Sequence, residues 1–378
     1  MDPTTAAPPA ATLALRMARI GLFGFPNSGK TTLFNALTGL DAPTGAHPYT
    51  TTSPNIGVAR LPDSRLDELS ALEGSAETVH ATLDLLDLPA MAKAGEGLGT
   101  GFIGRLRDMD ALAAVLRAHD DPSVPLDVGG SDPVAQAEEL LVELILADLE
   151  VFERRRDRIA REASADPRIR PVSEAVAAGT AALEQGVALR SGQWSVAQRK
   201  AFSDLAPLTI VPGIWVLNVA EDESDAASLV AAVERVVPRG DTVVAISARI
   251  EEEAAQLDPT DRQELYEGFG LGDGALAAMV RAAYDALGLL SFYTVGPKQS
   301  RAWTVRRGAT APEAAGKIHS DLKRGFIRAE VASLDDLIAR GGWDETKVAA
   351  KSRPGLMRLE GKDYVVQEDD VILVRFSV

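Results

Sequence analysis

The chain has 378 residues, with 39 Lys and Arg against 55 Asp and Glu, so its net charge is −16. This length allows two or three domains, and the acidic balance argues against a whole-surface nucleic-acid binder while leaving room for a local basic patch. The absence of cysteine excludes disulfides and thiolate metal sites, and the four histidines lack metal-ligand spacing. No apolar run approaches the length of a membrane span.

The first 17 residues, "MDPTTAAPPAATLALRM", lack the basic region of a signal peptide and hold few apolar residues. They predict a disordered tail, and we expect the protein in the cytoplasm.

Strands and helices then alternate. The pattern predicts strands at "ARIGLFG", "NIGVARLP", "ATLDLLDLP", "GIWVLNVA" and "DTVVAISA", and helices at "KTTLFNALTG" and "RLDELSAL". This alternation is typical of a mostly parallel, doubly wound α/β sheet with helices on both faces. We assign 18–132 and 205–290 to this nucleotide-binding domain.

Residues 133–204 show a helical pattern instead. Apolar residues recur every three or four positions along one long charged helix, and again on a returning helix: Val142, Ile145, Leu149, Phe152 and Ile159, then Val172, Val176 and Leu183. This spacing predicts a coiled-coil hairpin inserted into the α/β domain, with a surface helix pair as the alternative.

The segment 291–378 is rich in predicted strands, at "SFYTV", "RAWTV", "FIRAEV", "YVVQ" and "VILVRF", with a helix at "APEAAGKIHSDL". It therefore reads as a separate α+β domain. It holds 15 Lys and Arg against 12 Asp and Glu, a net of +3 on an acidic chain.

The segment "GFPNSGKT", residues 24–31, matches G-x-x-x-x-G-K-[ST] between a strand and a helix. Its glycines let backbone N–H groups point at phosphate oxygens, with the helix N-terminus behind them. Lys30 is expected to reach the β- and γ-phosphates and the Thr31 hydroxyl to bind Mg²⁺. The candidate phosphate-binding residues are Asn27, Ser28, Gly29, Lys30, Thr31 and Thr32.

Two further loops are expected to complete the site. In "HPYTTTSPNIG", one of the three consecutive threonines Thr50, Thr51 and Thr52 could be the first-switch ligand of Mg²⁺ and the γ-phosphate, and a Pro-bounded loop with no ligand is the alternative. The second switch needs an Asp at a strand end, and "TLDLLDLPAM" offers Asp87, with Asp84 as the alternative.

The turn after "GIWVLN" is expected to read the base. Guanine readers have Asn-Lys-x-Asp there, whereas this chain has Asn218-Val219-Ala220-Glu221. Glu221 is one methylene longer than Asp, and Val219 replaces the covering Lys. Strict guanine reading should therefore be lost. The alternative is that Glu221 only belongs to the start of the next helix.

Together these segments resemble the YchF family, the Obg-like ATPases within the translation-factor class of P-loop GTPases. The resemblance rests on "GFPNSGKTTLFNALT", "PYTTTSPNIGV", "PDSRLDEL", "GEGLGTGFIGRLRDMDA", "NVAE", "SARIEEE" and "SFYTVGPKQSRAWTVRRGATAPEAAGKIHSDLKRGFIRAEV", and runs from residue 18 to the end in the family's order. The end, "LEGKDYVVQEDDVILVRF", resembles a TGS domain, a ubiquitin-like module.

The resemblance implies a G domain, a helical coiled-coil insertion and a C-terminal TGS domain. It implies ribosome binding and ATP hydrolysis, often in preference to GTP. Thr51 matches the family's first-switch threonine, which makes it the candidate ligand of Mg²⁺ and the γ-phosphate. Ser247, Ala248 and Arg249 match the family's loop beside the base, and Asn27 resembles the asparagine with which some of these proteins hold K⁺. The partners expected are ATP or GTP and the ribosome or its RNA, reached through the TGS domain and the insertion, with neither membrane nor DNA.

The second switch departs from the family pattern, because Ala90 stands in place of Gly and about three residues are missing after Asp87. Met91 follows Ala90 at the other catalytic position of this switch, where the family also has an apolar residue and no Gln. We therefore expect a slow, Mg²⁺-dependent NTPase that works as a ribosome-associated switch. The alternatives are a nucleotide-sensing scaffold without hydrolysis, a strict GTPase, and a small-molecule kinase, which would need an acceptor site and an arginine-rich lid.

Overall fold

The computed structural model describes residues 18–43, 54–89, 98–120, 130–269 and 274–377. The chain divides into two compact units. The first holds Ala18–Ala59 and Asp84–Ala286, and the second holds Arg60–Leu83 and the chain from Leu287 onward. Among the described helices, none is both long enough and apolar enough to span a bilayer.

The first unit alternates strands and helices as predicted. Its elements are β1 (Arg19–Phe23), α1 (Lys30–Thr38), β2 (Asn55–Arg60), β4 (Thr82–Asp87), α3 (Thr100–Arg107), β5 (Ala111–Ala118), α4 (Pro133–Ala165), η1 (Pro167–Ile169), α5 (Arg170–Glu184), η2 (Leu189–Ser191), α6 (Val196–Ser203), η3 (Leu208–Ile210), β6 (Gly213–Val219), α7 (Ala226–Glu234), β7 (Thr242–Ile246), α8 (Ala248–Ala254), α9 (Pro259–Phe269) and α10 (Gly274–Leu287).

The sheet of this unit has the strand order β2-β4-β1-β5-β6-β7. The pairs β1–β4, β1–β5, β5–β6 and β6–β7 are parallel, with Leu22 opposite Asp87 and Phe23 opposite Ala114. Because parallel strands end at the same edge, the loops after β1, β4 and β6 come together there. The predicted doubly wound parallel sheet is confirmed.

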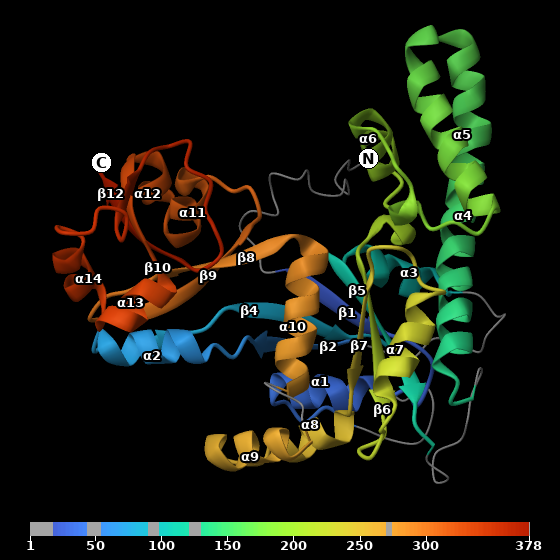
Figure 1. Ribbon diagram of the computed structural model, residues 1–378. Coiled ribbons are helices and arrows are strands. Elements are labelled where there is room, and N and C mark those ends of the chain that lie inside the picture. The colour runs from blue at the N-terminus through green and yellow to red at the C-terminus, as the bar shows by residue number, and fades with distance from the viewer. Residues whose placement is uncertain (1–17, 44–53, 90–97, 121–129, 270–273, 378) are drawn as a thin grey trace. The chain divides into compact units, whose positions relative to one another are not determined.

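Helices cover both faces of this sheet (Figure 1). On one face, Leu106 of α3, Leu140 and Leu144 of α4 and Val233 of α7 share a buried cluster with strand residues such as Trp215. On the other face α1 packs against α8. The β5 strand is buried along its whole length, which explains why its sequence is apolar apart from Arg117.

Helices α4 and α5 lie side by side in the inserted arm (Figure 1). Ile145, Phe152 and Ile159, spaced seven apart, are buried there together with Val176 and Leu183. Other members of the predicted seam differ.

Val142 is 52% exposed and Val172 38% exposed, so both were wrongly placed in the buried seam. Both satisfy the three- and four-residue spacing, as does Leu149, which packs partly buried against the cluster. The spacing alone therefore does not distinguish the buried members from the exposed ones.

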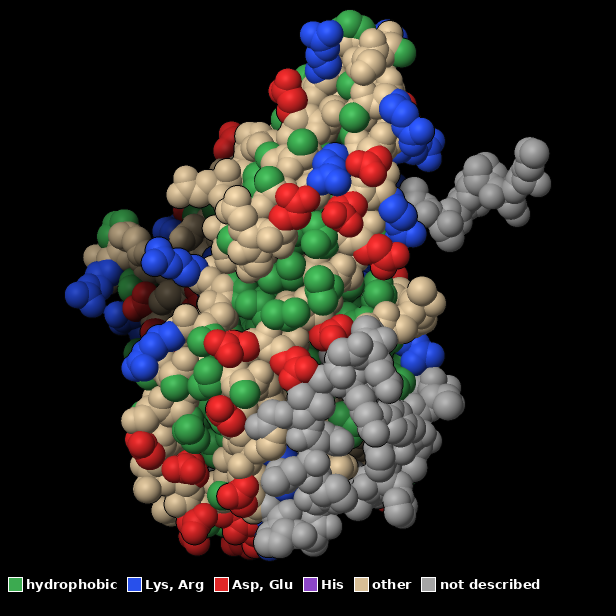
Figure 2. Space-filling view, turned by 90° about the vertical axis from the view of Figure 1, so that its right-hand side faces the viewer, with side chains coloured by type: hydrophobic (Ala, Val, Ile, Leu, Met, Phe, Trp, Pro, Cys, Tyr) green, Lys and Arg blue, Asp and Glu red, His purple; other side chains and the backbone are tan. Residues whose placement is uncertain are grey.

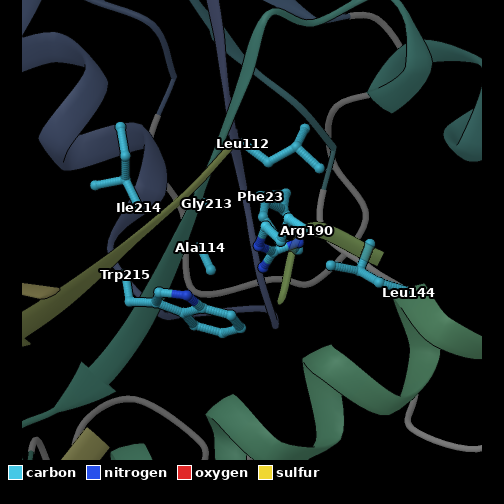
Figure 3. A pocket seen from close by; sticks show the side chains of 8 residues that line it. All are labelled: Phe23, Leu112, Ala114, Leu144, Arg190, Gly213, Ile214 and Trp215. Carbon is cyan, nitrogen blue, oxygen red and sulfur yellow. The ribbon is translucent and has the colours of Figure 1, made fainter. Parts of the chain in front are cut away.

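A buried ion pair connects the inserted segment to the sheet. Arg190 of η2 donates to both carboxylate oxygens of Asp241 at 2.6 Å, and the indole of Trp215 donates to the same carboxylate at 2.8 Å. Figure 3 shows Arg190 and Trp215 beside a cavity lined also by Phe23 and Leu144. The cavity measures about 10 Å³, room for at most one water molecule, so it is a packing defect and no ligand site.

The second unit has its own core and sheet. Its elements are α2 (Ser64–Leu72), β3 (Thr78–Val79), β8 (Leu289–Thr294), β9 (Ser300–Arg306), α11 (Ala311–Ile318), α12 (Ser320–Arg324), β10 (Phe326–Ser333), α13 (Leu334–Arg340), α14 (Trp343–Ala349), β11 (Arg358–Glu360) and β12 (Asp370–Phe376). The strand order is β11-β10-β12-β8-β9-β3. Phe292 and Val331 share the core of this unit with Ala314 of α11.

This unit includes a segment that the sequence pattern assigns to the nucleotide-binding domain. Residues 60–83 pack with it because β3 pairs with β9, Arg65 donates to both oxygens of Asp369, and Tyr293 donates to Asp63 at 2.6 Å. The predicted boundary at residue 291 does not include this segment, since its two-residue strand leaves no pattern in the sequence.

Two predicted elements of this unit differ in the structure. The helix "APEAAGKIHSDL" is broken at His319, whose backbone is extended, so α11 and α12 are separate. The segment "YVVQ" forms no strand, only an isolated bridge between Val365 and Thr310. This segment is followed by a turn that leads to β12.

Candidate nucleotide-binding site

The loop between β1 and α1 has the backbone of a phosphate cradle. Gly24 and Gly29 adopt φ values of 145° and 90°, and Asn27 adopts 59°, a left-handed conformation that Asn tolerates. A Cβ on Gly24 would lie 2.5 Å from the carbonyl oxygen of Val115, and one on Gly29 would collide with the Asn218 amide. Only glycine therefore fits at these two positions.

The side chain of Lys30 is folded into this loop. Its ammonium donates to the Phe25 carbonyl at 2.6 Å and to the Ser28 hydroxyl at 3.4 Å, and the residue is buried. The Lys30 ammonium therefore lies where phosphate oxygens could replace the Phe25 carbonyl as its acceptor.

Thr31 and Asp87 meet at the carboxyl edge of the sheet. The Thr31 hydroxyl donates to Asp87 Oδ2 at 2.9 Å, and the amide of Asn55, at the start of β2, donates to the same oxygen at 3.0 Å. Asp87 is buried, and its Oδ1 has no partner among the described residues. A buried carboxylate oxygen without a donor is the feature that a cation would satisfy.

Asp84, the alternative candidate, lies elsewhere. It pairs in register with Arg19 at the beginning of β1, and its carboxylate is 3.9 Å from the Arg19 guanidinium. The phosphate loop follows the other end of β1. Asp84 therefore lies three residues before Asp87 along β4, away from the phosphate loop.

These residues fit Mg²⁺. The ion prefers hard oxygen ligands and takes few from the protein when phosphates supply the others. Thr31 and Asp87 provide one hydroxyl and one carboxylate in contact. The described residues hold no cluster of three or more His, Cys, Asp or Glu, so phosphates would supply the other ligands of the ion.

Asn218, at the end of β6, connects two loops of the site. Its Nδ2 donates to the Ser28 carbonyl at 3.1 Å, and its Oδ1 accepts from the Ala248 backbone N–H at 3.0 Å. His119 contacts the Asn218 carbonyl at 2.9 Å. Both ends of the buried Asn218 amide are thus committed to holding the phosphate loop and the loop before α8.

Glu221 and Arg249 face each other beside these loops. Arg249 Nε lies 2.5 Å from Glu221 Oε1, and the Arg249 and Glu221 side chains are 82% and 38% exposed. Ser247 caps α8 by accepting from the Ile250 N–H. Val219 packs against the core and offers no polar group to a base.

The remaining predicted residues are partly described. Thr32 is half-buried in the first turn of α1. Thr51, Ala90 and Met91 lie outside the described residues.

The sequence did not single out Asn55 or His119. Asn55 follows Pro54 at the point where the predicted first-switch loop meets a strand, and an amide at that position was the available signal. His119 follows the β5 strand, but its contact with β6 depends on the strand order, which no local pattern reveals.

Comparison with known families gives two matches that together cover most of the chain. A model described as a 50S ribosome-binding GTPase matches residues 19–145, and a model of the C-terminal part of YchF GTPases, described as a protein of unknown function, matches 289–377.

Curated relatives match over nearly their whole length. The chain is 37% identical over 366 residues to the "Ribosome-binding ATPase YchF" of Bacillus subtilis, covering 95% of this chain and 99% of the relative. It is 33% identical to "Obg-like ATPase 1" of Oryza sativa, with 95% and 92% covered. The solved YchF GTPase of Schizosaccharomyces pombe has 26% identity, a TM-score of 0.80 and coverage of 95% and 97%.

Proposed function

The chain belongs to the YchF family, and on that premise we propose that it is a Mg²⁺-dependent purine nucleotide-binding protein that hydrolyses ATP slowly and acts at the ribosome. Its relative in Bacillus subtilis is named a ribosome-binding ATPase. Because ribosomes are cytoplasmic, the proposed ribosome binding supports a cytoplasmic location for this protein.

The observation that carries nucleotide binding is the contact between Thr31 and Asp87 next to Lys30, with Asp87 Oδ1 unpartnered among the described residues. In this proposal Thr31, Asp87 and Thr51 hold Mg²⁺, which would neutralise charge on the phosphates. Lys30 leaves the Phe25 carbonyl for the phosphate oxygens. Asn27 would hold K⁺ as a further positive charge.

The contacts of the base loops support ATP over GTP. Guanine needs an acceptor for its N1–H and 2-amino groups and a donor for O6. Glu221, the candidate acceptor, is engaged by Arg249, and the Ala248 N–H, a candidate donor, is bonded to Asn218. Adenine has no N1–H, so it does not depend on that carboxylate.

Equilibrium titration of the full chain with ATP and with GTP, each with Mg²⁺, tests the base preference. We expect ATP to bind at least as tightly as GTP, and Lys30→Ala to weaken both. Tight GTP binding with negligible ATP binding would make the protein a strict GTPase and overturn the proposal.

Slow turnover follows from the second switch. Met91 is apolar and cannot orient the attacking water. Ala90 replaces Gly, and wherever φ must be positive Ala is less favourable than Gly by about 1 kcal/mol. Both changes leave the contacts of Lys30 and Thr31 intact. Binding should therefore survive while hydrolysis waits for a partner that orders the switch.

The ribosome contact is assigned to the second unit. Arg306, Lys317 and Lys323 have no ion-pair partner among the described residues, and Lys323 lies over Gly316 beside Lys317. Burial and then the nearby Arg306 guanidinium lower the pKa of Lys317, so these two cations lie close together, with Glu313 near Lys323. Such a cluster attracts RNA phosphates.

The arm offers fewer available charges. Five of its arginines pair with acids of the arm itself, and Figure 2 shows basic and acidic side chains interspersed along it. The pairs are Arg154 with Glu150, Arg155 and Arg158 with Glu162, Arg156 with Glu184, and Arg168 with Asp166. This pairing also argues against an arginine-rich kinase lid, because these guanidinium groups are already engaged.

A further inference from the structure

The ion pair between Glu221 and Arg249 has a consequence for base selection. Glu221 occupies the turn after β6, where guanine readers place their Asp, and Arg249 is the second residue of α8. Their contact at 2.5 Å joins the two loops that border the base. The Arg249 side chain is 82% exposed and lies outside the buried face of α8, so folding of this helix does not require it.

A carboxylate paired with a guanidinium is a weaker acceptor for a second ligand. One of its oxygens already lies against a guanidinium nitrogen, and the positive charge beside it offsets part of its negative charge. To read guanine, Glu221 would have to accept from N1–H and from the 2-amino group, and it would have to leave Arg249 to do so. ATP makes no such demand, because its N1 accepts and position 2 carries no amino group.

We propose that Arg249 is a specificity-determining residue that disfavours GTP by holding the Glu221 carboxylate. The inference rests on the proposed nucleotide function of this site and adds a residue to its base selection. Attraction of the phosphates by Arg249 acts on ATP and GTP alike and cancels in the ratio of their affinities. Any stacking of Arg249 on the base persists without the Glu221 carboxylate and is separated by a Glu221→Gln background.

The size of the effect follows from the exposure of the pair. Exposed ion pairs contribute up to about fivefold to an equilibrium constant. Releasing Glu221 should therefore improve GTP binding relative to ATP binding by about two- to fivefold. The change is small but measurable as a ratio, because both nucleotides are titrated on the same protein preparation.

The test is the ratio of the Kd for GTP to the Kd for ATP, measured with Mg²⁺ for the full chain and its variants. Arg249→Ala and Arg249→Gln should lower this ratio about two- to fivefold. In a Glu221→Gln background, the same changes should leave the ratio unaltered, because no carboxylate remains to be released. Arg168→Gln, which breaks an exposed pair with Asp166 in the arm, is the matched control and should have no effect.

An unchanged ratio in Arg249→Ala would overturn the inference, as would a shift of equal size in the Glu221→Gln background. The proposed base preference is judged separately, on the unmodified chain. If that chain prefers GTP but Arg249→Ala still shifts the ratio toward GTP, the role of Arg249 stands and the proposed preference fails.

Discussion

Asn218 shows how single residues define this site. Its side chain holds the phosphate loop through the Ser28 carbonyl and the base loop through the Ala248 N–H, so it positions both. The sequence could place Asn218 at a strand end beside a nucleotide. It could not reveal these partners, because they come from segments 190 and 30 residues away.

At the same scale, Asp87 and Asp84 separate cleanly. The sequence favours Asp87, at the tip of the strand, and leaves Asp84, within the strand, as the alternative. The register of β4 against β1 decides, because Asp87 lies opposite Leu22 near the phosphate loop and Asp84 opposite Arg19 at the other end.

Asp87→Asn should therefore lower Mg²⁺-dependent ATP hydrolysis by about tenfold or more, which corresponds to about 1.4 kcal/mol of transition-state stabilisation. Asn retains the shape but loses the charge that the cation needs. Hydrolysis is measured over a range of Mg²⁺ concentrations, with Asp84→Asn as the matched control that should retain activity. The reverse pattern, with Asp84→Asn inactive, would contradict this account of the second switch.

The inserted arm illustrates what the sequence predicts at the scale of elements. Residues 145, 152 and 159 repeat every seven positions and are buried as expected. The arm also depends on a close approach that periodicity does not reveal. Gly179 of α5 lies against Phe152 and Phe202, and an added Cβ would be 2.7 Å and 3.0 Å from their rings.

Gly179→Ala should destabilise the arm by about 1–3 kcal/mol, although Ala is the better helix former, because the added methyl group overpacks this aromatic contact. Chemical denaturation and hydrogen exchange in α4 and α5 would measure it. Gly104→Ala is the control, since nothing lies within 4 Å of its Cβ on helix α3. Equal stability of the two variants would show that the rings have room to move.

For the whole molecule, the unexpected feature is the grouping of residues 60–83 with the C-terminal unit. Glu73 accepts from the Trp343 N–H, and burial raises the pKa of that carboxyl. Such links join parts of the chain separated by more than 200 residues, as the 270 between Glu73 and Trp343 show, and the local patterns used to draw domain boundaries cannot report them. Removing the C-terminal segment would therefore uncover α2 and β3 as well, so substitutions are the better probe of its function.

The central claim is that this protein hydrolyses ATP slowly until the ribosome, contacted through the second unit, orders its switches. Single-turnover hydrolysis of ATP by the full chain, with and without ribosomes, tests it most directly. The comparison uses a triple variant, Arg306→Gln with Lys317→Gln and Lys323→Gln. An arm variant that loses the same charge, Arg154→Gln with Arg155→Gln and Arg158→Gln, serves as the control.

We predict basal hydrolysis well below about one turnover per second. Ribosomes should stimulate the unmodified chain and the arm variant but not the triple variant of the second unit, and the stimulation should weaken as salt rises. Fast hydrolysis without ribosomes, or equal stimulation of both triple variants, would contradict the account.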